Sequence, residues 1–278
     1  MDSMSQGTME NQPQRTSISK YCEKHCEYDA MISRVGIGRF KREFITKCPE
    51  CEKEEKDRSV ERIRGTILSY TELSFERVGI PLRYSSYELG DLAGKNEKQA
   101  NIIKRCKGYV EKFNDLSALG TSLIFTGSPG TGKTMISLSM VKPLIKKMIS
   151  KEDPKKFETG CFETSYTYCI YKNIYDLFDE IKSIYRKESQ DSETDIIKKY
   201  TGTELLIIDE VGAQSNSEFE TITLFRIINS RYENMKPTIL ISNLSEFDLT
   251  NYIGERTIDR FKENNGAVFV FDWESLRS

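Results

Sequence analysis

Three apolar runs from residue 122 onward predict buried strands of an α/β sheet. They cover residues 122–126, 204–208 and 237–242. Buried parallel strands are nearly continuous in apolar residues, because helices cover both faces of such a sheet. Glycine or polar residues follow each run, and ligands of open α/β sheets bind at the carboxyl ends of the strands. We therefore expect a ligand site where these runs end.

Helical spacing of apolar residues lies between and before these runs. Residues 134–149 carry four apolar side chains at this spacing, Ile136, Met140, Leu144 and Met148. Residues 95–113 carry a second such face, formed by Ile102, Ile103, Cys106, Val110 and Phe113. The charged stretch 52–64 is expected to be a solvated helix or linker. The pattern predicts an α/β fold with a central, mostly parallel sheet flanked by helices.

A glycine-rich loop follows the first run. Its residues are Gly127, Ser128, Pro129, Gly130, Thr131, Gly132, Lys133 and Thr134. Between a strand and a helix, this pattern predicts that backbone N–H groups surround nucleotide phosphates, that Lys133 reaches the β- and γ-phosphate oxygens, and that Thr134 offers its hydroxyl to Mg²⁺. An ordinary turn would explain Pro129 and Gly130 but not the Lys133-Thr134 pair. Nucleotide binding is the leading hypothesis.

The other two runs end in polar side chains that suit the same chemistry. Asp209 is expected to hold the Mg²⁺ shell and Glu210 to polarise an attacking water. Asn243 is placed to contact the γ-phosphate or that water. The plainer alternatives are a strand that merely ends in acidic residues, and a turn or cap role for Asn243.

Two arginines further on are spaced for one helical face. Arg256 and Arg260 lie four residues apart. Arginine can stabilise the charge of a transferring phosphoryl group, and it makes hydrolysis depend on assembly when a neighbouring subunit supplies it. Salt-bridging surface arginines are the alternative.

Composition narrows the class of protein. With 278 residues, 37% hydrophobic and 30% charged, the chain suits one main soluble domain plus a small module. Residues 1–20 lack the apolar core of a signal peptide, and no run approaches the roughly 18 apolar residues of a membrane span. We expect a cytoplasmic protein with no membrane partner. A net charge of −2 argues against a general polyanion binder but leaves room for a local basic track.

Four cysteines near the start predict a structural Zn²⁺ site. They are Cys22, Cys26, Cys48 and Cys51, and 21 residues separate the two pairs. His25 could replace Cys26 as a ligand, but adjacent residues rarely both bind one ion, so His25 is expected beside the site or at the surface. The alternative is four unrelated thiols in a leader. We expect a disordered leader at 1–19, a zinc-binding, partner-binding module at 20–60, a linker at 61–83 and an ATPase domain at 84–278.

From about Phe75 onward the chain resembles the DnaC-type bacterial replicative-helicase loaders, which are AAA+ ATPases, and more loosely the IstB-type transposition ATPases. The matching stretches are residues 75–81, 127–134, 205–214, 254–260 and 271–277. The resemblance implies that Asn243 is sensor 1, that Arg260 is the arginine finger and that Arg256 is a nearby nucleotide-responsive arginine. The 35 residues after Asn243 are too few for a full helical lid, so a minimal lid or none is expected, with Arg277 a weak sensor 2 candidate.

The resemblance also implies a groove for single-stranded DNA, reached by Tyr185, Ser217 and Phe219. Aromatic side chains stack on bases without reading sequence, and neighbouring lysines and arginines meet phosphates. Core packing is an equal alternative for Tyr185 and a slightly better one for Phe219.

The leading hypothesis is therefore an ATP-dependent and Mg²⁺-dependent loader that delivers a hexameric, DnaB-type replicative helicase onto single-stranded DNA. The N-terminal module would grip the helicase, and ATP would favour self-association into a ring or open spiral. The protein would act in the bacterial cytoplasm, encoded by the host or by a phage. Two alternatives stay open, an IstB-like ATPase that regulates transposition on duplex DNA and a non-hydrolysing adaptor that nucleotide stabilises.

Overall fold

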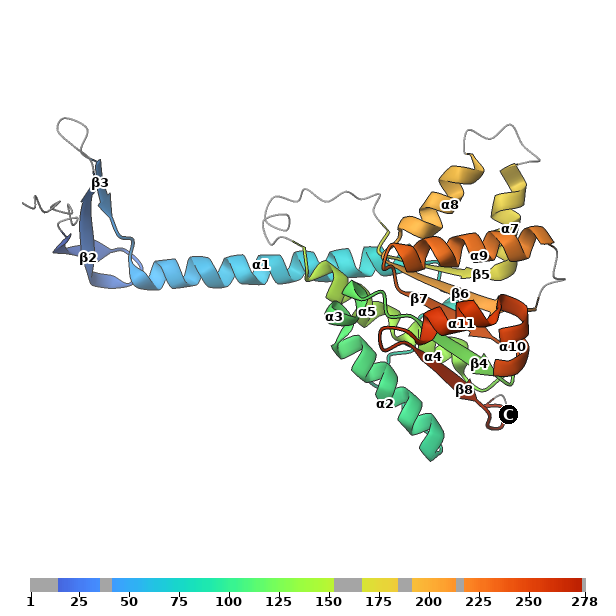
Figure 1. Ribbon diagram of the computed structural model, residues 1–278. Helices are drawn as coiled ribbons and strands as arrows, with labels where there is room; N and C mark the ends of the chain where they lie inside the picture. Colours follow the sequence, from blue (N-terminus) through green and yellow to red (C-terminus); the bar gives the residue numbers. More distant parts are fainter. Residues whose placement is uncertain (1–14, 36–41, 153–166, 185–191, 214–217, 277–278) are drawn as a thin grey trace, which may run out of the picture. The chain divides into compact units, whose positions relative to one another are not determined.

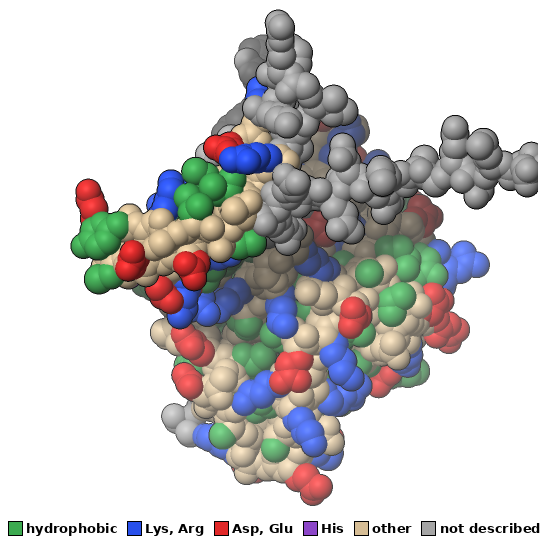
Figure 2. Space-filling view, turned by 90° about the vertical axis from the view of Figure 1, so that its left-hand side faces the viewer, with side chains coloured by type: hydrophobic (Ala, Val, Ile, Leu, Met, Phe, Trp, Pro, Cys, Tyr) green, Lys and Arg blue, Asp and Glu red, His purple; other side chains and the backbone are tan. Residues whose placement is uncertain are grey.

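The computed structural model describes residues 15–35, 42–152, 167–184, 192–213 and 218–276. These residues divide into two compact units, residues 1–65 and residues 66–278. No helix in the described ranges is long and apolar enough to cross a membrane. On the face drawn in Figure 2, Lys and Arg side chains are interspersed with Asp and Glu side chains, in keeping with the net charge of −2.

A five-stranded parallel sheet forms the centre of the larger unit, in the order β5-β6-β7-β4-β8 (Figure 1). Its strands are β4 (Leu123–Gly127), β5 (Cys169–Asn173), β6 (Leu205–Val211), β7 (Thr238–Ser242) and β8 (Ala267–Phe271). The three expected strands are β4, β6 and β7. They lie side by side at the centre of the sheet, and nearly all their side chains are buried. This arrangement confirms the predicted fold class.

Helices flank the sheet, as Figure 1 shows. Along the chain, the helices before β5 are α1 (Pro49–Glu76), α2 (Glu97–Glu111), α3 (Phe113–Ala118), α4 (Lys133–Ser139) and α5 (Val141–Ile149), with a short 3₁₀ turn η1 at Leu82–Tyr84. Those after β5 are α7 (Ile174–Ser183), α8 (Glu193–Gly202), α9 (Glu218–Glu233), α10 (Glu246–Ile253) and α11 (Glu255–Lys262). Side-chain caps fix several starts. Asn96 accepts from the Gln99 amide at α2, and Ser192 and Asp195 form a capping box at α8.

The helix expected at residues 134–149 is divided in two at Met140. Pro143 explains the break, because proline lacks the N–H that would bond the carbonyl four residues earlier. Pro143 is tolerated in the first turn of α5, where that N–H has no partner within the helix. The predicted apolar positions still face the core, since Ile136, Met140 and Leu144 are fully buried.

A buried arginine ties the amino ends of two central strands together. Arg231 of α9 is 0% exposed, and its guanidinium donates to the carbonyls of Tyr200, Thr203 and Pro237 at 2.8, 2.8 and 2.6 Å. Its Nε also donates to Thr238 Oγ1 at 3.0 Å. A buried charge is tolerated only when its hydrogen bonds are made, so this network fixes how β6 and β7 enter the sheet.

The smaller unit contains a three-stranded antiparallel sheet, β1-β2-β3. Its strands are β1 (Arg15–Cys22), β2 (Cys26–Val35) and β3 (Arg42–Ile45), and the first part of α1 follows.

Two segments differ from the expected boundaries. β1 begins at Arg15, inside the expected leader, because its backbone pairs with β2 along its whole length. Helix α1 continues to Glu76, through much of the expected linker, and its charged residues lie on a solvated helix.

Candidate functional site

A cavity of about 340 Å³ lies at the carboxyl ends of the central strands. Eight residues predicted from the sequence line it, namely Pro129, Gly130, Gly132, Lys133, Thr134, Asp209, Glu210 and Asn243. They come from the loop after β4, from β6 and from the end of β7. These strands are neighbours, so their ends bring together side chains that are far apart in the sequence.

The glycine-rich loop joins β4 to α4. Gly132 has φ 97°, a left-handed conformation that glycine adopts without strain. The Lys133 ammonium donates to the carbonyls of Gly127 and Ser128 at 2.8 and 2.7 Å, and Thr131 Oγ1 donates to the same Ser128 carbonyl at 2.7 Å. These bonds place the Lys133 ammonium inside the curve of the loop, where it suits an anionic ligand.

Asp209 accepts three hydrogen bonds at the end of β6. Its Oδ2 accepts from Thr134 Oγ1 and from the Tyr171 hydroxyl, both at 2.9 Å, and its Oδ1 accepts from the Glu210 amide at 2.7 Å. Burial raises the pKa of Asp209, while these three hydrogen bonds act in the opposite direction. Thr134 and Asp209 therefore offer a hydroxyl and a carboxylate, the oxygen ligands that suit Mg²⁺.

Glu210 lies next to Asp209 in an uncommon conformation. Its φ is 60°, in the left-handed region that non-glycine residues rarely adopt. Oε2 of Glu210 accepts from Asn173 Nδ2 at 2.6 Å, and Asn173 also caps α7 by accepting from the Tyr175 amide at 3.0 Å. The carboxylate is thereby fixed at the mouth of the cavity, where a general base would be needed.

Tyr171 and Asn173 also line the cavity, although the sequence did not predict them. Both lie on β5, where Asn173 is paired in register with Asp209. A signal was present for Asn173, because it lies two residues after the short apolar run 169–171 and directly precedes an amphipathic helix. Nothing local in the sequence marks Tyr171, because its contact with Asp209 depends on the neighbouring strand.

The two predicted arginines lie on α11, away from this cavity. Arg260 donates to Asn229 Oδ1, and its guanidinium lies over the Tyr232 ring at 4.8 Å from the centroid. Arg256 is exposed. Of the residues that the structure describes, those lining the cavity include neither arginine. A role for them in hydrolysis would have to be played in another subunit's site.

The residues predicted to contact DNA are only partly described. Tyr185 and Ser217 lie outside the described residues. Phe219 of α9 packs against the hydrophobic core, and the Lys182 ammonium lies 5.9 Å from its ring centroid. Lys182 also forms an ion pair of 2.7 Å with Glu220. Phe219 is therefore only partly buried against the core, and Lys182 is the cation beside its ring.

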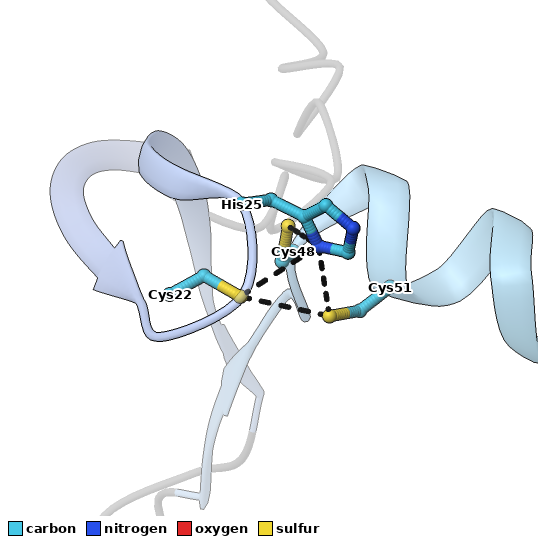
Figure 3. Close-up of side chains that lie close together, drawn as sticks. All are labelled: Cys22, His25, Cys48 and Cys51. Atoms are coloured by element: carbon cyan, nitrogen blue, oxygen red, sulfur yellow. Dashed lines mark hydrogen bonds between the residues drawn. The ribbon is translucent and has the colours of Figure 1, made fainter.

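A second cluster lies in the smaller unit, where four side chains point toward one another (Figure 3). Their ligand atoms, from Cys22, His25, Cys48 and Cys51, all lie within 4.8 Å of one another. Cys51 Sγ is 3.6 Å from Cys22 Sγ and 3.3 Å from His25 Nδ1. Three thiols and one imidazole are a donor set that suits tetrahedral Zn²⁺.

The cluster corrects one predicted ligand. His25 takes the fourth place, whereas Cys26 is exposed and lies outside the group. The turn between β1 and β2 explains the exchange, because it directs His25 toward Cys51 while Cys26 begins β2 with φ 63°. Only one of these two adjacent residues belongs to the cluster, as expected, but that residue is His25 and not Cys26.

Hydrogen bonds around the cluster move the pKa values of two of its thiols in opposite directions. Backbone N–H groups of Lys24 and His25 lower the pKa of Cys22 to about 6. His25 Nε2 lies 3.0 Å from Glu54 Oε1, a carboxylate that orients the ring with Nδ1 toward the thiols. The hydrogen bond with Cys22 raises the pKa of Cys51 to about 11, since the two thiols compete for one proton.

Residues 165–259 match the family of IstB-like ATP binding proteins. The replicative helicase loader DnaC of Escherichia coli strain K12 is 27% identical over 205 residues, which cover 74% of this chain and 75% of that protein. DnaC of Buchnera aphidicola subsp. Schizaphis graminum is 28% identical over 201 residues, 72% of this chain and 73% of that protein. A crystal structure of the DnaC helicase loader is similar with a TM-score of 0.53 and 24% identity, over 69% of this chain and 99% of that one. The likeness in fold confirms the expected AAA+ architecture.

Proposed function

Because the chain is related to the DnaC-type replicative helicase loaders, in the DnaC/IstB-like group of AAA+ ATPases, we propose that it is an ATP-dependent loader. It delivers a hexameric, DnaB-type replicative helicase onto single-stranded DNA in the bacterial cytoplasm. The observation that carries the proposal is the cavity in which Lys133, Asp209 and Glu210 converge. The similarity to helicase loaders then supplies the purpose of that site.

ATP binding uses the glycine-rich loop and the two oxygen ligands beside it. Backbone N–H groups of residues 130–134 surround the phosphates, and Lys133 exchanges its carbonyl partners for the β- and γ-phosphate oxygens. Thr134 and Asp209 would hold Mg²⁺, which neutralises charge on the phosphates when bound. Thr134 already lies within hydrogen-bond distance of Asp209, so this part of the site needs little rearrangement.

Hydrolysis uses the carboxylate of Glu210 and the amide of Asn243. Glu210 accepts a proton from the attacking water, and Asn243 fixes either that water or the γ-phosphate. Asn173 holds Glu210 by one carboxylate oxygen, Oε2, which leaves Oε1 to contact a water. Both side chains lie on the same cavity as Lys133.

Arg260 completes the site of a neighbouring subunit. It lies on α11, outside the cavity of its own chain, and Asn229 and Tyr232 hold its guanidinium. Head-to-tail contacts of this kind build rings or open spirals. Hydrolysis then reports that subunits have assembled, and Arg256 on the same helix responds to the nucleotide.

The module of residues 20–60 binds Zn²⁺ and contacts the helicase. Zn²⁺ would be held by Cys22, His25, Cys48 and Cys51, where it joins the β1-β2 turn to the start of α1. Small modules of this size need such a link to fold. The partner role rests on the loader function and on the separation of this unit from the ATPase unit.

Single-stranded DNA contacts the ATPase unit near α7 and α9. Phe219 and Lys182 supply a ring and a cation there, and Tyr185 and Ser217 are proposed to add to the same groove. Base stacking and phosphate contacts of this kind are independent of sequence.

The proposal is tested by ATP hydrolysis with and without single-stranded DNA. We expect DNA to stimulate turnover in wild-type protein and not in the Arg260→Ala variant. Equal turnover of the two proteins would exclude Arg260 as a finger supplied to a neighbour. Capture of a replicative helicase by the wild-type protein, and its loss in the Cys48→Ser, Cys51→Ser double variant with ATP binding retained, tests the partner role.

An IstB-like regulator of transposition is the second candidate, because residues 165–259 match that family of ATP-binding proteins. Capture of a transposase and a preference for duplex DNA would favour it. Normal ATP binding without hydrolysis would instead identify a non-hydrolysing adaptor.

A further inference from the structure

The segment after β8 runs along the outer side of the phosphate-binding loop. β8 pairs with β4 in parallel register up to Gly127 and Phe271, so both strands end at the same place. The Ser128 amide donates to the Phe271 carbonyl at 3.1 Å, which continues the contact into the loop. Residues 272–276 therefore leave the sheet directly beside residues 128–132.

Two hydrogen bonds join this segment to the loop. Trp273 Nε1 donates to the Thr131 carbonyl at 3.0 Å, and the Leu276 amide donates to the Gly130 carbonyl at 2.8 Å. The Trp273 ring packs against Phe271 with a centroid separation of 4.8 Å. A side-chain donor and a backbone donor thus reach two successive carbonyls of the loop.

These two carbonyls matter because of how a phosphate-binding loop is built. When successive N–H groups converge on an anion, the carbonyls of the same peptide groups point away from it. Trp273 and Leu276 hold the carbonyls of Gly130 and Thr131 by hydrogen bonds. These bonds therefore favour the orientation in which the N–H groups of the same peptide groups face the phosphates. The donors from 272–276 select the binding-competent form of the loop.

The segment also reaches the cavity itself. Leu276 is one of the side chains that line it, together with Gly130 and Gly132. Its Cδ1 lies 3.2 Å from the position that a Cβ on Gly132 would occupy, so the leucine packs directly on the loop. An ion pair of 2.6 Å between Lys98 and Asp272 ties the start of the segment to α2.

We propose that residues 272–276 form a clamp that holds the phosphate-binding loop in its nucleotide-binding conformation and adds Leu276 to the wall of the nucleotide site. Trp273 is the positioning residue, since it acts on the nucleotide only through the Thr131 peptide group. Leu276 is a binding residue, because it lines the cavity. The clamp rests on the proposed nucleotide binding and deepens it.

Affinity for a non-hydrolysable ATP analogue, measured by calorimetry on the full chain, tests the clamp. Trp273→Phe keeps an aromatic ring beside Phe271 and removes the N–H donor together with the five-membered ring that carries it, so we expect at least about fivefold weaker binding, the effect of one hydrogen bond. Adding Leu276→Ala should weaken binding to about tenfold or more, because it opens the wall as well. Val270→Ala is the matched control, since Val270 is 41% exposed on β8 just before Phe271 and lies outside the cavity lining.

The outcomes separate the clamp from the proposed function. If the wild-type protein binds no ATP analogue, the nucleotide site itself is wrong. If it binds, and the Trp273→Phe, Leu276→Ala double variant binds within twofold of wild type, the clamp is wrong. Weaker binding in the double variant with unchanged binding in Val270→Ala supports the clamp.

A second measurement needs no variant. Trp273 is the one tryptophan of the chain, so fluorescence excited at a wavelength that its 14 tyrosines do not absorb reports on the clamp alone. A clamp that favours nucleotide binding must be favoured by nucleotide to the same extent, because coupling between two equilibria is reciprocal. We expect saturating nucleotide to reduce the quenching of Trp273 by acrylamide, and an unchanged quenching constant would overturn the clamp.

Discussion

The Tyr171 hydroxyl donates a hydrogen bond of 2.9 Å to Oδ2 of Asp209. The same carboxylate oxygen accepts from Thr134, the residue proposed to share Mg²⁺ with Asp209. Tyr171 is buried on β5, where the desolvated phenol has a raised pKa and so stays a neutral donor. Its backbone N–H donates to the Val78 carbonyl at 2.9 Å, which fixes the residue from a second side.

Tyr171→Phe should therefore weaken Mg²⁺ binding. The phenyl ring keeps the packing and only the donor to Asp209 is lost, so the Mg²⁺ concentration for half-maximal nucleotide binding should rise by about tenfold. Nucleotide binding without Mg²⁺ should not change. Titration of Mg²⁺ against a fluorescent ATP analogue measures both quantities.

Tyr200→Phe is the matched control for that variant. It also removes a buried phenol that bonds a carboxylate, since the Tyr200 hydroxyl donates to Glu180 at 2.6 Å, but it lies on α8. The Mg²⁺ requirement of this control should equal that of wild type. A Tyr171→Phe protein with an unchanged Mg²⁺ requirement would show that the hydroxyl does not orient Asp209 for the metal.

His25 and Cys26 are adjacent, and the structure assigns only the first to the cluster. His25→Ala should release the bound Zn²⁺ or lower its affinity strongly, because it removes one of four ligands and the Glu54 contact. Cys26→Ser should retain one Zn²⁺ per chain. Metal analysis of freshly purified proteins decides, and the opposite result would restore the ligand set expected from the sequence.

The sequence predicted more of the ATPase site than of the metal cluster. Lys133, Asp209 and Asn243 each follow an apolar run, and parallel strands bring such ends together without further information. Whether His25 or Cys26 faces the cluster depends on the geometry of a three-residue turn. The spacing of the cysteines in the sequence does not determine that geometry. Tyr171 and Trp273 act across strands that are distant in the sequence, so their roles emerge only from the strand order β5-β6 and β4-β8.

The Glu180 carboxylate links α7 to β5 and α8, and it should make the free energy of unfolding depend on pH. Burial alone would raise the pKa of Glu180, but hydrogen bonds from Lys172, Lys199 and Tyr200 outweigh it and lower the pKa to about 2. A carboxyl group with a lowered pKa in the folded state stabilises the fold above its unfolded pKa and loses this contribution as the pH falls. The loss should run from about pH 4.5 downward to about pH 2.

Glu180→Gln should therefore be less stable than wild type at pH 7, by roughly 1 kcal/mol after allowance for solvent screening. The difference in the free energy of unfolding should shrink by pH 3. Urea denaturation at the two pH values measures it, with Glu111→Gln, an exposed carboxyl at the end of α2, as the control. A gap that stays constant with pH would contradict the assigned interactions of Glu180.

Mixing two inactive variants tests whether Arg260 acts in a neighbouring subunit. Lys133→Ala removes nucleotide binding and Arg260→Ala removes the finger, which typically lowers turnover by about a thousandfold. A Lys133→Ala subunit still carries an intact Arg260 for the next site, so an equimolar mixture should regain ATP hydrolysis stimulated by single-stranded DNA. A mixture no more active than the separate variants would place Arg260 outside the reaction.

The central claim is that ATP drives delivery of a helicase hexamer onto single-stranded DNA. The most direct measurement counts helicase hexamers deposited on a covalently closed single-stranded circle. Such a circle has no free end over which a closed helicase ring could pass, so deposition requires that the ring be opened. We predict deposition with wild-type protein and ATP, and none with the Lys133→Ala variant. Equal deposition by the two proteins, or none by wild type with its cognate helicase, would contradict the account.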